Sequence, residues 1–168
     1  MPASYPTNVK TFTTRNSGDA IQPSHVNDLQ DEVTAIETDL LKTWSNWAPA
    51  WTNLTVGNGT TVAKYFKLGP FVFYELRFVL GTTSSVGGAV VVSLPVNAVG
   101  TDAFVAGHGE AADANGLLYQ VHTRLVSVST MAVFADTGTS AVQINTTVPF
   151  VWADTDGISI IGFYEAAA

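Results

Sequence analysis

Five apolar residues recur at spacings of three and four within residues 21–44, and this spacing is the strongest constraint on how the chain can fold. An α-helix places residues at such intervals on a single narrow stripe. Pro23 suits the first turn of that helix, with Gln22 or Ser24 as the cap. The pattern predicts a short coiled-coil stem, and the alternative is an amphipathic helix that folds back onto its own β domain. The stripe residues are Val26, Leu29, Val33, Ile36 and Leu40.

The stem is short, and its core leaves the number of helices open. It holds about two and a half heptads, fewer than the three or four that identify a coiled coil securely. With Val26 as heptad position a, Val at a and Leu at d favour a two-helix coiled coil. The layer of Ile36 and Leu40 instead favours a coiled coil of three or more helices. No Lys or Arg occurs between Arg15 and Lys42, so acidic outer positions have no basic partner within the seam. We expect the acidic positions to face a basic surface on whatever holds the N-terminus.

The segments that flank the helix have different characters. Residues 1–20 show almost no periodicity, which predicts an extended attachment arm with at most a short strand at 9–13, the alternative being a frayed terminus. Residues 44–51 place three tryptophans around Pro49, and we interpret them as the hub where stem meets head rather than as a sugar-stacking platform. These tryptophans are Trp44, Trp47 and Trp51.

The remainder of the chain carries β-strand signals. Residues 71–80 alternate between a wholly apolar face and a mixed face, which suits the inside of a sandwich or a subunit interface. A Gly-Asn-Gly turn at 57–59 and a loop at 81–88 separate neighbouring strands. The fold class predicted is mainly β, with a sandwich or jelly-roll-like knob at 48–168 after an arm at 1–20 and a stem at 21–47. The expected strands span 52–56, 60–68, 71–80, 89–96, 103–112, 117–128, 131–135, 141–144, 148–152 and 157–165.

Composition narrows the classes of function. The net charge of −7 is shared by both parts of the chain, −3 over residues 1–47 and −4 over 48–168, and scattered bases do not make a nucleic-acid or anionic-membrane surface. Charged residues form 12% of the chain, against roughly 25% in ordinary domains. The chain has no cysteine, and we see no apolar secretion signal or membrane span. These features favour an exposed assembly over a cytosolic enzyme.

Two stretches resemble virion proteins of tailed bacteriophages. The run from Gly18 to Val33 is similar to a segment, D-x-I-x-x-x-x-V-N-x-L-Q-x-E-V, that opens many phage tail, fibre and head-fibre proteins. Residues 56–60, 64–65, 78–89 and 93–96 resemble a β-domain of minor tail and fibre proteins from phages of actinobacteria and related hosts. The resemblance covers residues 18–40 and about 50–97, and nothing after residue 97 carries it.

The resemblance implies a homotrimer in the phage particle. Its arm, residues 1–20, would bind a capsid or tail protein, three helices would form the stem, and the β head would face outward. Whether the chain belongs to the head or the tail of the particle stays open. Nothing in the matched motifs is catalytic.

Candidate chemistry is sparse. The three histidines lack metal-ligand spacing, Asp154 begins only a fragment of a calcium loop, and no nucleophile frame is present. We therefore expect no enzyme activity, no metal and no cofactor. The alternative function is recognition of a host-surface carbohydrate by exposed aromatic residues of the knob. The candidates for glycan contact are Tyr119, Phe134 and Trp152.

Overall fold

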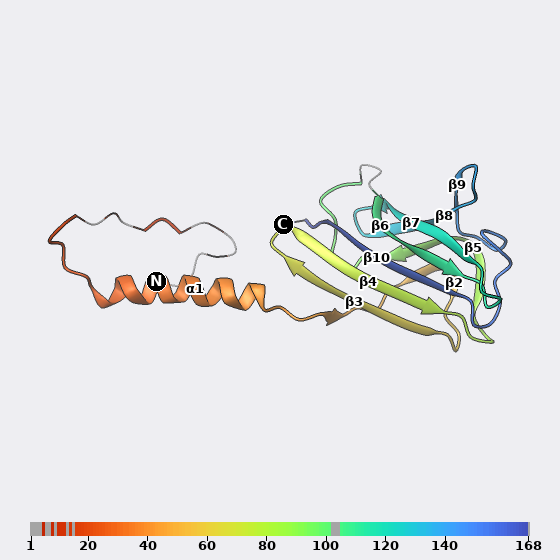
Figure 1. Cartoon of the computed structure of the whole chain (residues 1–168), viewed down its shortest axis with the longest axis horizontal. Helices are drawn as coiled ribbons and strands as arrows, with labels where there is room; N and C mark the ends of the chain where they lie inside the picture. The colour runs from red at the N-terminus through yellow and green to blue at the C-terminus, as the bar shows by residue number, and fades with distance from the viewer. Residues whose placement is uncertain are drawn as a thin grey trace. The chain divides into compact units, whose positions relative to one another are not determined.

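The computed structural model of the chain describes residues 5, 8, 10–12, 14, 16–101 and 105–167, and it is mainly β. Contacts divide the chain into two compact units, Met1–Thr43 and Trp44–Ala168, which we call the helix unit and the head (Figure 1). The strand expected at 9–13 rests on Val9 and Thr13, which lie outside the described residues. Residues 10–12 are not in a strand.

The helix unit contains α1 (Pro23–Leu40). Of the two predicted caps, Gln22 is the N-cap and Ser24 lies within the helix. Pro23 occupies the first turn, where its missing N–H has no intrahelical partner to lose. The Nδ1 atom of His25 accepts a hydrogen bond from the backbone N–H of Gln22 at 3.1 Å. The stem was expected to extend to residue 47, but the helix ends at Leu40. Ser45–Asn46 cannot continue it, because these two residues pair with a strand of the head.

The head is built from strands that pair antiparallel with their neighbours. Most of the predicted strands are present within two residues of their expected ends. The strands are β1 (Ser45–Asn46), β2 (Trp51–Thr55), β3 (Thr60–Leu68), β4 (Phe71–Val79), β5 (Ser85–Ser93), β6 (Val105–Ala112), β7 (Leu118–Ser127), β8 (Thr130–Asp136), β9 (Ala141–Gln143) and β10 (Gly157–Glu165).

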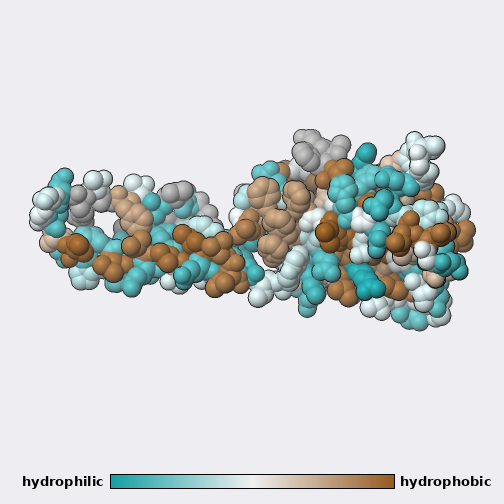
Figure 2. All heavy atoms as spheres, in the orientation of Figure 1, coloured by the Kyte–Doolittle hydropathy of each residue, from teal (hydrophilic) through white to brown (hydrophobic). Residues whose placement is uncertain are grey.

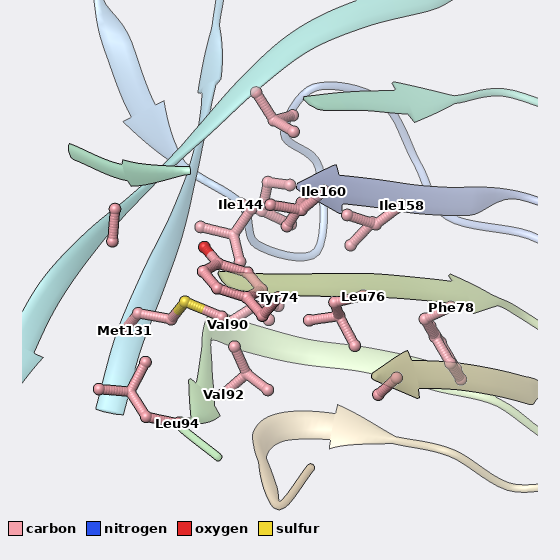
Figure 3. Packing of buried hydrophobic residues seen from close by; sticks show 14 of the residues in the cluster. Tyr74, Leu76, Phe78, Val90, Val92, Leu94, Met131, Ile144, Ile158 and Ile160 are labelled. Atoms are coloured by element: carbon pink, nitrogen blue, oxygen red, sulfur yellow. The ribbon is translucent and has the colours of Figure 1, made fainter. Parts of the chain in front are cut away.

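All of these strands belong to one sheet. Its order is β1-β3-β4-β10-β6-β7-β8-β5-β2, and β9 pairs with β8 beside this path. The sheet curls, so that strands from its two halves share a core (Figures 1 and 3). The side chains that meet in this core include Tyr74, Leu76 and Phe78 of β4, Val90 and Val92 of β5, Met131 of β8, and Ile158 and Ile160 of β10.

Strand β4 confirms the alternation read from the sequence. Its even-numbered side chains are buried in the core, and the hydroxyl of Tyr74 lies 2.8 Å from Thr123 Oγ1. Burial raises the pKa of Tyr74 well above its usual value. The odd-numbered side chains of β4 lie on the outer face of the sheet. Within the sheet, β4 pairs with β3 along one edge and with β10 along the other.

The head differs from the predicted strands in three places. β5 begins at Ser85, inside the expected loop at 81–88, because a strand paired with β2 accommodates Gly87 and Gly88. No strand forms at 148–152, where the Val148-Pro149 peptide bond is cis and Val148 makes only an isolated bridge to Asn145. The two-residue strand β1 was not predicted, since so short a segment has no periodicity.

Consecutive strands form the two ends of the sheet. β1 stands at one end of the strand order and β2 at the other, and only residues 47–50 join them. The pairing of β2 with β5 shifts between Thr52 and Leu54, and Asn53 between them has a φ of 60°. One end strand is therefore very short, and the other contains an irregularity.

Two loops interlock in what we call the clasp, formed by residues 56–59 and 81–84. Asn58 Oδ1 accepts hydrogen bonds from the N–H and the hydroxyl of Thr83, both at 2.9 Å, and the Ser84 hydroxyl donates to the Val56 carbonyl. Gly57 has a φ of 55°, and a Cβ there would lie 2.4 Å from the Thr83 carbonyl oxygen. The clasp is thus a structural contact that fixes the two loops to each other.

Candidate interaction surfaces

The predicted stripe of α1 is exposed. The helix presents its apolar residues to solvent (Figure 2), and Glu32 and Asp39 are its buried residues. This is the reverse of the usual arrangement, in which a helix buries its apolar stripe and leaves its charges outside. The exposed fractions are Val26 48%, Leu29 53%, Val33 45%, Ile36 40% and Leu40 65%.

Two described residues of the N-terminal arm, Tyr5 and Lys10, contact acidic side chains of the helix. The Tyr5 hydroxyl donates a hydrogen bond to Asp39 Oδ2 at 2.6 Å, and the Tyr5 N–H donates to Glu32 Oε2 at 3.2 Å. Lys10 Nζ lies 3.5 Å from Glu32 Oε1 and 3.8 Å from Asp28 Oδ1. Three of the acidic side chains expected to face a basic partner, Asp28, Glu32 and Asp39, thus contact residues of this chain's own arm.

Asp39 sits in a favourable electrostatic position. Lys42, one turn further along the chain, forms an ion pair with it. The hydrogen bond from Lys42, followed by that from Tyr5, holds the pKa of Asp39 below its usual value. The hydrogen bond to Asp39 raises the pKa of the Tyr5 hydroxyl, because ionisation would remove the proton that this bond needs.

The three hub tryptophans do not form one cluster. Trp47 packs edge-on against Tyr74 at 6.1 Å between ring centroids, and Trp51 lies 5.5 Å from Phe78. Both contribute to the edge of the core. Trp44 instead packs edge-on against Phe66 at 4.9 Å and is 47% exposed. The three tryptophans were expected to form one hub at the start of the head. Trp47 and Trp51 instead pack against the core, and Trp44 lies on the outer face of the sheet beside Phe66.

Two of the three candidate glycan-binding aromatics lie together. Tyr119 and Trp152 both contact Phe150, with ring centroids 5.4 and 4.5 Å apart respectively. The Trp152 N–H donates to the carbonyl of Asn145 at 2.9 Å. All of these rings are partly buried against the core, so the cluster does not present a free stacking platform.

Phe134 lies on the opposite face of the sheet. It is paired with His122 across β7 and β8, and the two rings stack with centroids 5.6 Å apart. The guanidinium of Arg124 lies 5.3 Å from the Phe134 ring. Burial lowers the pKa of His122, although Asp136 at 3.7 Å opposes the shift. The structure therefore gives no single aromatic surface containing all three candidates.

The turn at residues 154–157, which resembles the start of a calcium loop, has a structural role. Asp156 is buried, and its carboxylate accepts hydrogen bonds from the N–H of Ala114 at 2.8 Å and of Ala153 at 2.6 Å. These bonds hold the β6–β7 turn against the segment that precedes β10. Among the residues that the structure describes, no group of three or more His, Asp or Glu side chains is placed to hold a metal ion.

One surface was missed at the sequence level. The outer face of the sheet carries a row of aromatic rings from Trp44 through Phe66 and Phe73 to Phe163. The alternation of 71–80 had placed Phe73 on the mixed face, but only strand pairing shows that phenylalanines of three strands are adjacent. The signal was the apolar content of the mixed face of residues 71–80, which the sequence analysis matched to the inside of a sandwich or to a subunit interface.

Comparison with known proteins does not assign the chain to a family. No protein-family model, no curated protein and no solved structure matches it. Within the described residues, no helix is long and apolar enough to cross a membrane.

Proposed function

We propose that the chain is a structural virion protein of a tailed phage, a homotrimeric fibre or decoration protein. The single observation that carries the self-association is the exposed stripe of α1, because five apolar side chains on one side of a helix are stabilised when they pack against copies of themselves. The assignment to a phage particle is supported by the resemblance of residues 18–40 and 50–97. In this proposal α1 forms a coiled-coil stem, and the head is a sandwich-like knob.

The covered acidic side of α1 supports the choice of seam. Asp28, Glu32 and Asp39 are engaged by Tyr5 and Lys10, so the apolar stripe is the side of the helix left for a second helix. Packing of the stripes leaves the ion pairs of the arm in place. The acidic side chains then need no partner from another copy.

The arm is the anchor in this proposal. Binding to a capsid or tail protein exchanges the contacts of Tyr5 and Lys10 with α1 for contacts with that protein. Three arms on one trimer act together, so that attachment is firm even when each arm binds weakly. The head, with its closed core, faces outward.

Light scattering tests the self-association. The expected result is a particle three times the 17.8 kDa chain mass. Ile36→Asp places a charge within the seam and is expected to lower the mass, whereas Thr34→Asp adds the same charge at an exposed position beside the stripe and is expected to leave it unchanged. A native chain that stays at the monomer mass at all concentrations would refute the proposal. Cryo-electron microscopy of the particle would test the virion location.

A further inference from the structure

We propose that the outer face of β3, β4 and β10 is a second contact surface between copies of this chain. We call it the phenylalanine face, and it consists of Trp44, Phe66, Phe71, Phe73, Ile161 and Phe163. The inference rests on the self-association in the proposed function, and it names a part of the head that takes part in it.

The face begins with a continuous row of rings. Phe66 and Phe73 are cross-strand partners that stack with ring centroids 4.9 Å apart and planes 11° apart. Phe163 pairs with Phe73 from the other side, with centroids 5.9 Å apart. Cross-strand aromatic pairs stabilise a sheet, but that role alone does not require the rings to remain open to water.

The outer members of the face are strongly exposed. Ile161 is 67% exposed, Phe163 60%, Trp44 47% and Phe71 46%. A groove of about 570 Å³ runs over this area, lined by the aromatic row together with Ile161 and Gly162. Figure 2 shows hydrophobic atoms gathered over these strands of the head. Such a groove is large enough to receive side chains of another molecule.

The exposed area agrees with an interface. An aromatic side chain can bury about 150–250 Å², so the four exposed residues leave on the order of 400 Å² of apolar surface open. That value falls in the range of roughly 300–600 Å² for the largest patch on a monomer, which is often functional. A standard interface buries about 800 Å² per partner, and the phenylalanine face would supply about half of that area.

The charges around the face favour a second copy over a charged partner. The neighbouring outward positions, read from the strand register, contain bases at Lys64 and Arg77 and acids at Glu75, Glu110 and Glu165. A rim that carries both signs is complementary to itself, whereas a strongly acidic or basic partner would meet like charges. The outer side of β7 differs, since Gln120, His122 and Arg124 separate its exposed apolar residues.

Single cysteines test the proposal in the full chain, because the sequence contains no native cysteine. The probe is Ile161→Cys, and the matched control is Val151→Cys, at a position 75% exposed in a loop outside the face. In the oligomer we expect maleimide to modify the Ile161→Cys variant at least about tenfold more slowly than the control. On dilution to the monomer mass the two rates should become similar.

The outcomes separate this proposal from the proposed function. If the chain forms an oligomer and both cysteines react at the same rate, the phenylalanine face is not an interface, while the stem remains supported. Protection of Ile161→Cys that persists in the diluted monomer means that the chain itself covers the face, and the proposal fails. A native chain that is monomeric throughout refutes both proposals.

A second variant confirms the result without a chemical probe. Phe163→Asp should raise the concentration at which the oligomer dissociates by at least about tenfold, and Val151→Asp should leave it unchanged. Because Phe163 is mostly exposed, its replacement is compatible with folding, which circular dichroism checks. An unchanged dissociation concentration in a folded Phe163→Asp variant contradicts the proposal.

Discussion

The head and the helix unit distribute polar and apolar residues in opposite ways. In the head, Phe78 and Leu76 have no exposed surface and most charges lie outside. In the helix unit, Glu32 and Asp39 are buried beneath the arm, while Ile36 and its neighbours on the stripe face solvent. The head therefore has the apolar core that stabilises a single chain, and the helix unit does not.

The head and the helix unit are stabilised by different kinds of contact. Burial of apolar area is the main favourable contribution to folding, and the head achieves it within one copy. The helix unit holds Tyr5 and Lys10 by hydrogen bonds and ion pairs to largely covered acidic side chains, and the cost of removing these charges from water offsets much of the attraction. The apolar stripe of α1 is exposed, and under the proposed self-association it packs against other copies. The stability of the helix unit should therefore depend on protein concentration, and that of the head much less.

The largest expected difference comes from matched truncations in the two regions. Phe78→Ala removes a fully buried ring that packs against Trp51, and we expect it to lower the free energy of unfolding by about 3–5 kcal/mol. Ile36→Ala, at an exposed site on the stripe, should have a small effect in dilute solution and a larger one where the oligomer forms. Urea denaturation at two protein concentrations measures both, and equal losses at low concentration would break the contrast.

The next effect concerns a charge buried in the head. Asp156→Asn replaces one acceptor oxygen by an NH₂ group, which then faces a backbone N–H in place of accepting from it. We expect a loss of about 1–3 kcal/mol in the free energy of unfolding. Asp154→Asn is the control, since Asp154 is exposed two residues earlier. Thermal unfolding compares the two, and similar melting temperatures would show that the buried carboxylate is unimportant for the loops.

A smaller effect is expected at a buried hydroxyl. The Tyr164 hydroxyl donates to the Val96 carbonyl at 2.6 Å, and Tyr164→Phe should lower the free energy of unfolding by about 1 kcal/mol. Burial raises the pKa of Tyr164 to about 12, above an unfolded value near 10. This contribution is complete below about pH 10 and is lost as the pH rises towards 12. Alkaline unfolding should therefore depend less on pH in Tyr164→Phe, and an unchanged slope contradicts this.

The smallest effect is expected at the arm. Tyr5→Phe removes the hydrogen bond to Asp39, so the pKa of Asp39 should rise towards its usual value while global unfolding stays the same. Because the pKa of Asp39 is lowered in the folded chain, its contribution is present above the unfolded pKa and is lost as the pH falls through the lower value. Carboxyl chemical shifts measured by NMR during an acid titration report this change. A titration curve that does not move would place the arm away from α1.

The sequence determined much of the fold through local patterns. Gln22 and Pro23 marked the start of α1, and the alternation of Val72, Tyr74 and Leu76 identified the buried face of β4. β10 was predicted at its observed bounds, 157–165. These successes share a cause, since capping and two-residue alternation depend only on residues close together in the chain.

The remaining features depend on contacts between distant residues. Periodicity does not show that Phe66, Phe73 and Phe163 would be neighbours, because that requires the strand order. It also does not show that Tyr5 would meet Asp39, 34 residues later. Likewise, the Asn58 turn was predicted, but its partner Thr83 could be identified only from the fold. The proposed interaction surfaces were thus less predictable than the strands that support them.

The end strands of the sheet have a consequence for solubility at high concentration. An exposed strand edge offers unpaired backbone groups that can recruit a strand from another molecule and start aggregation. Here β1 has two residues, and β2 is interrupted at Asn53. Neither offers a long, regular template for a foreign strand. We therefore expect these two end strands to recruit a foreign strand less readily than a long, regular edge strand would.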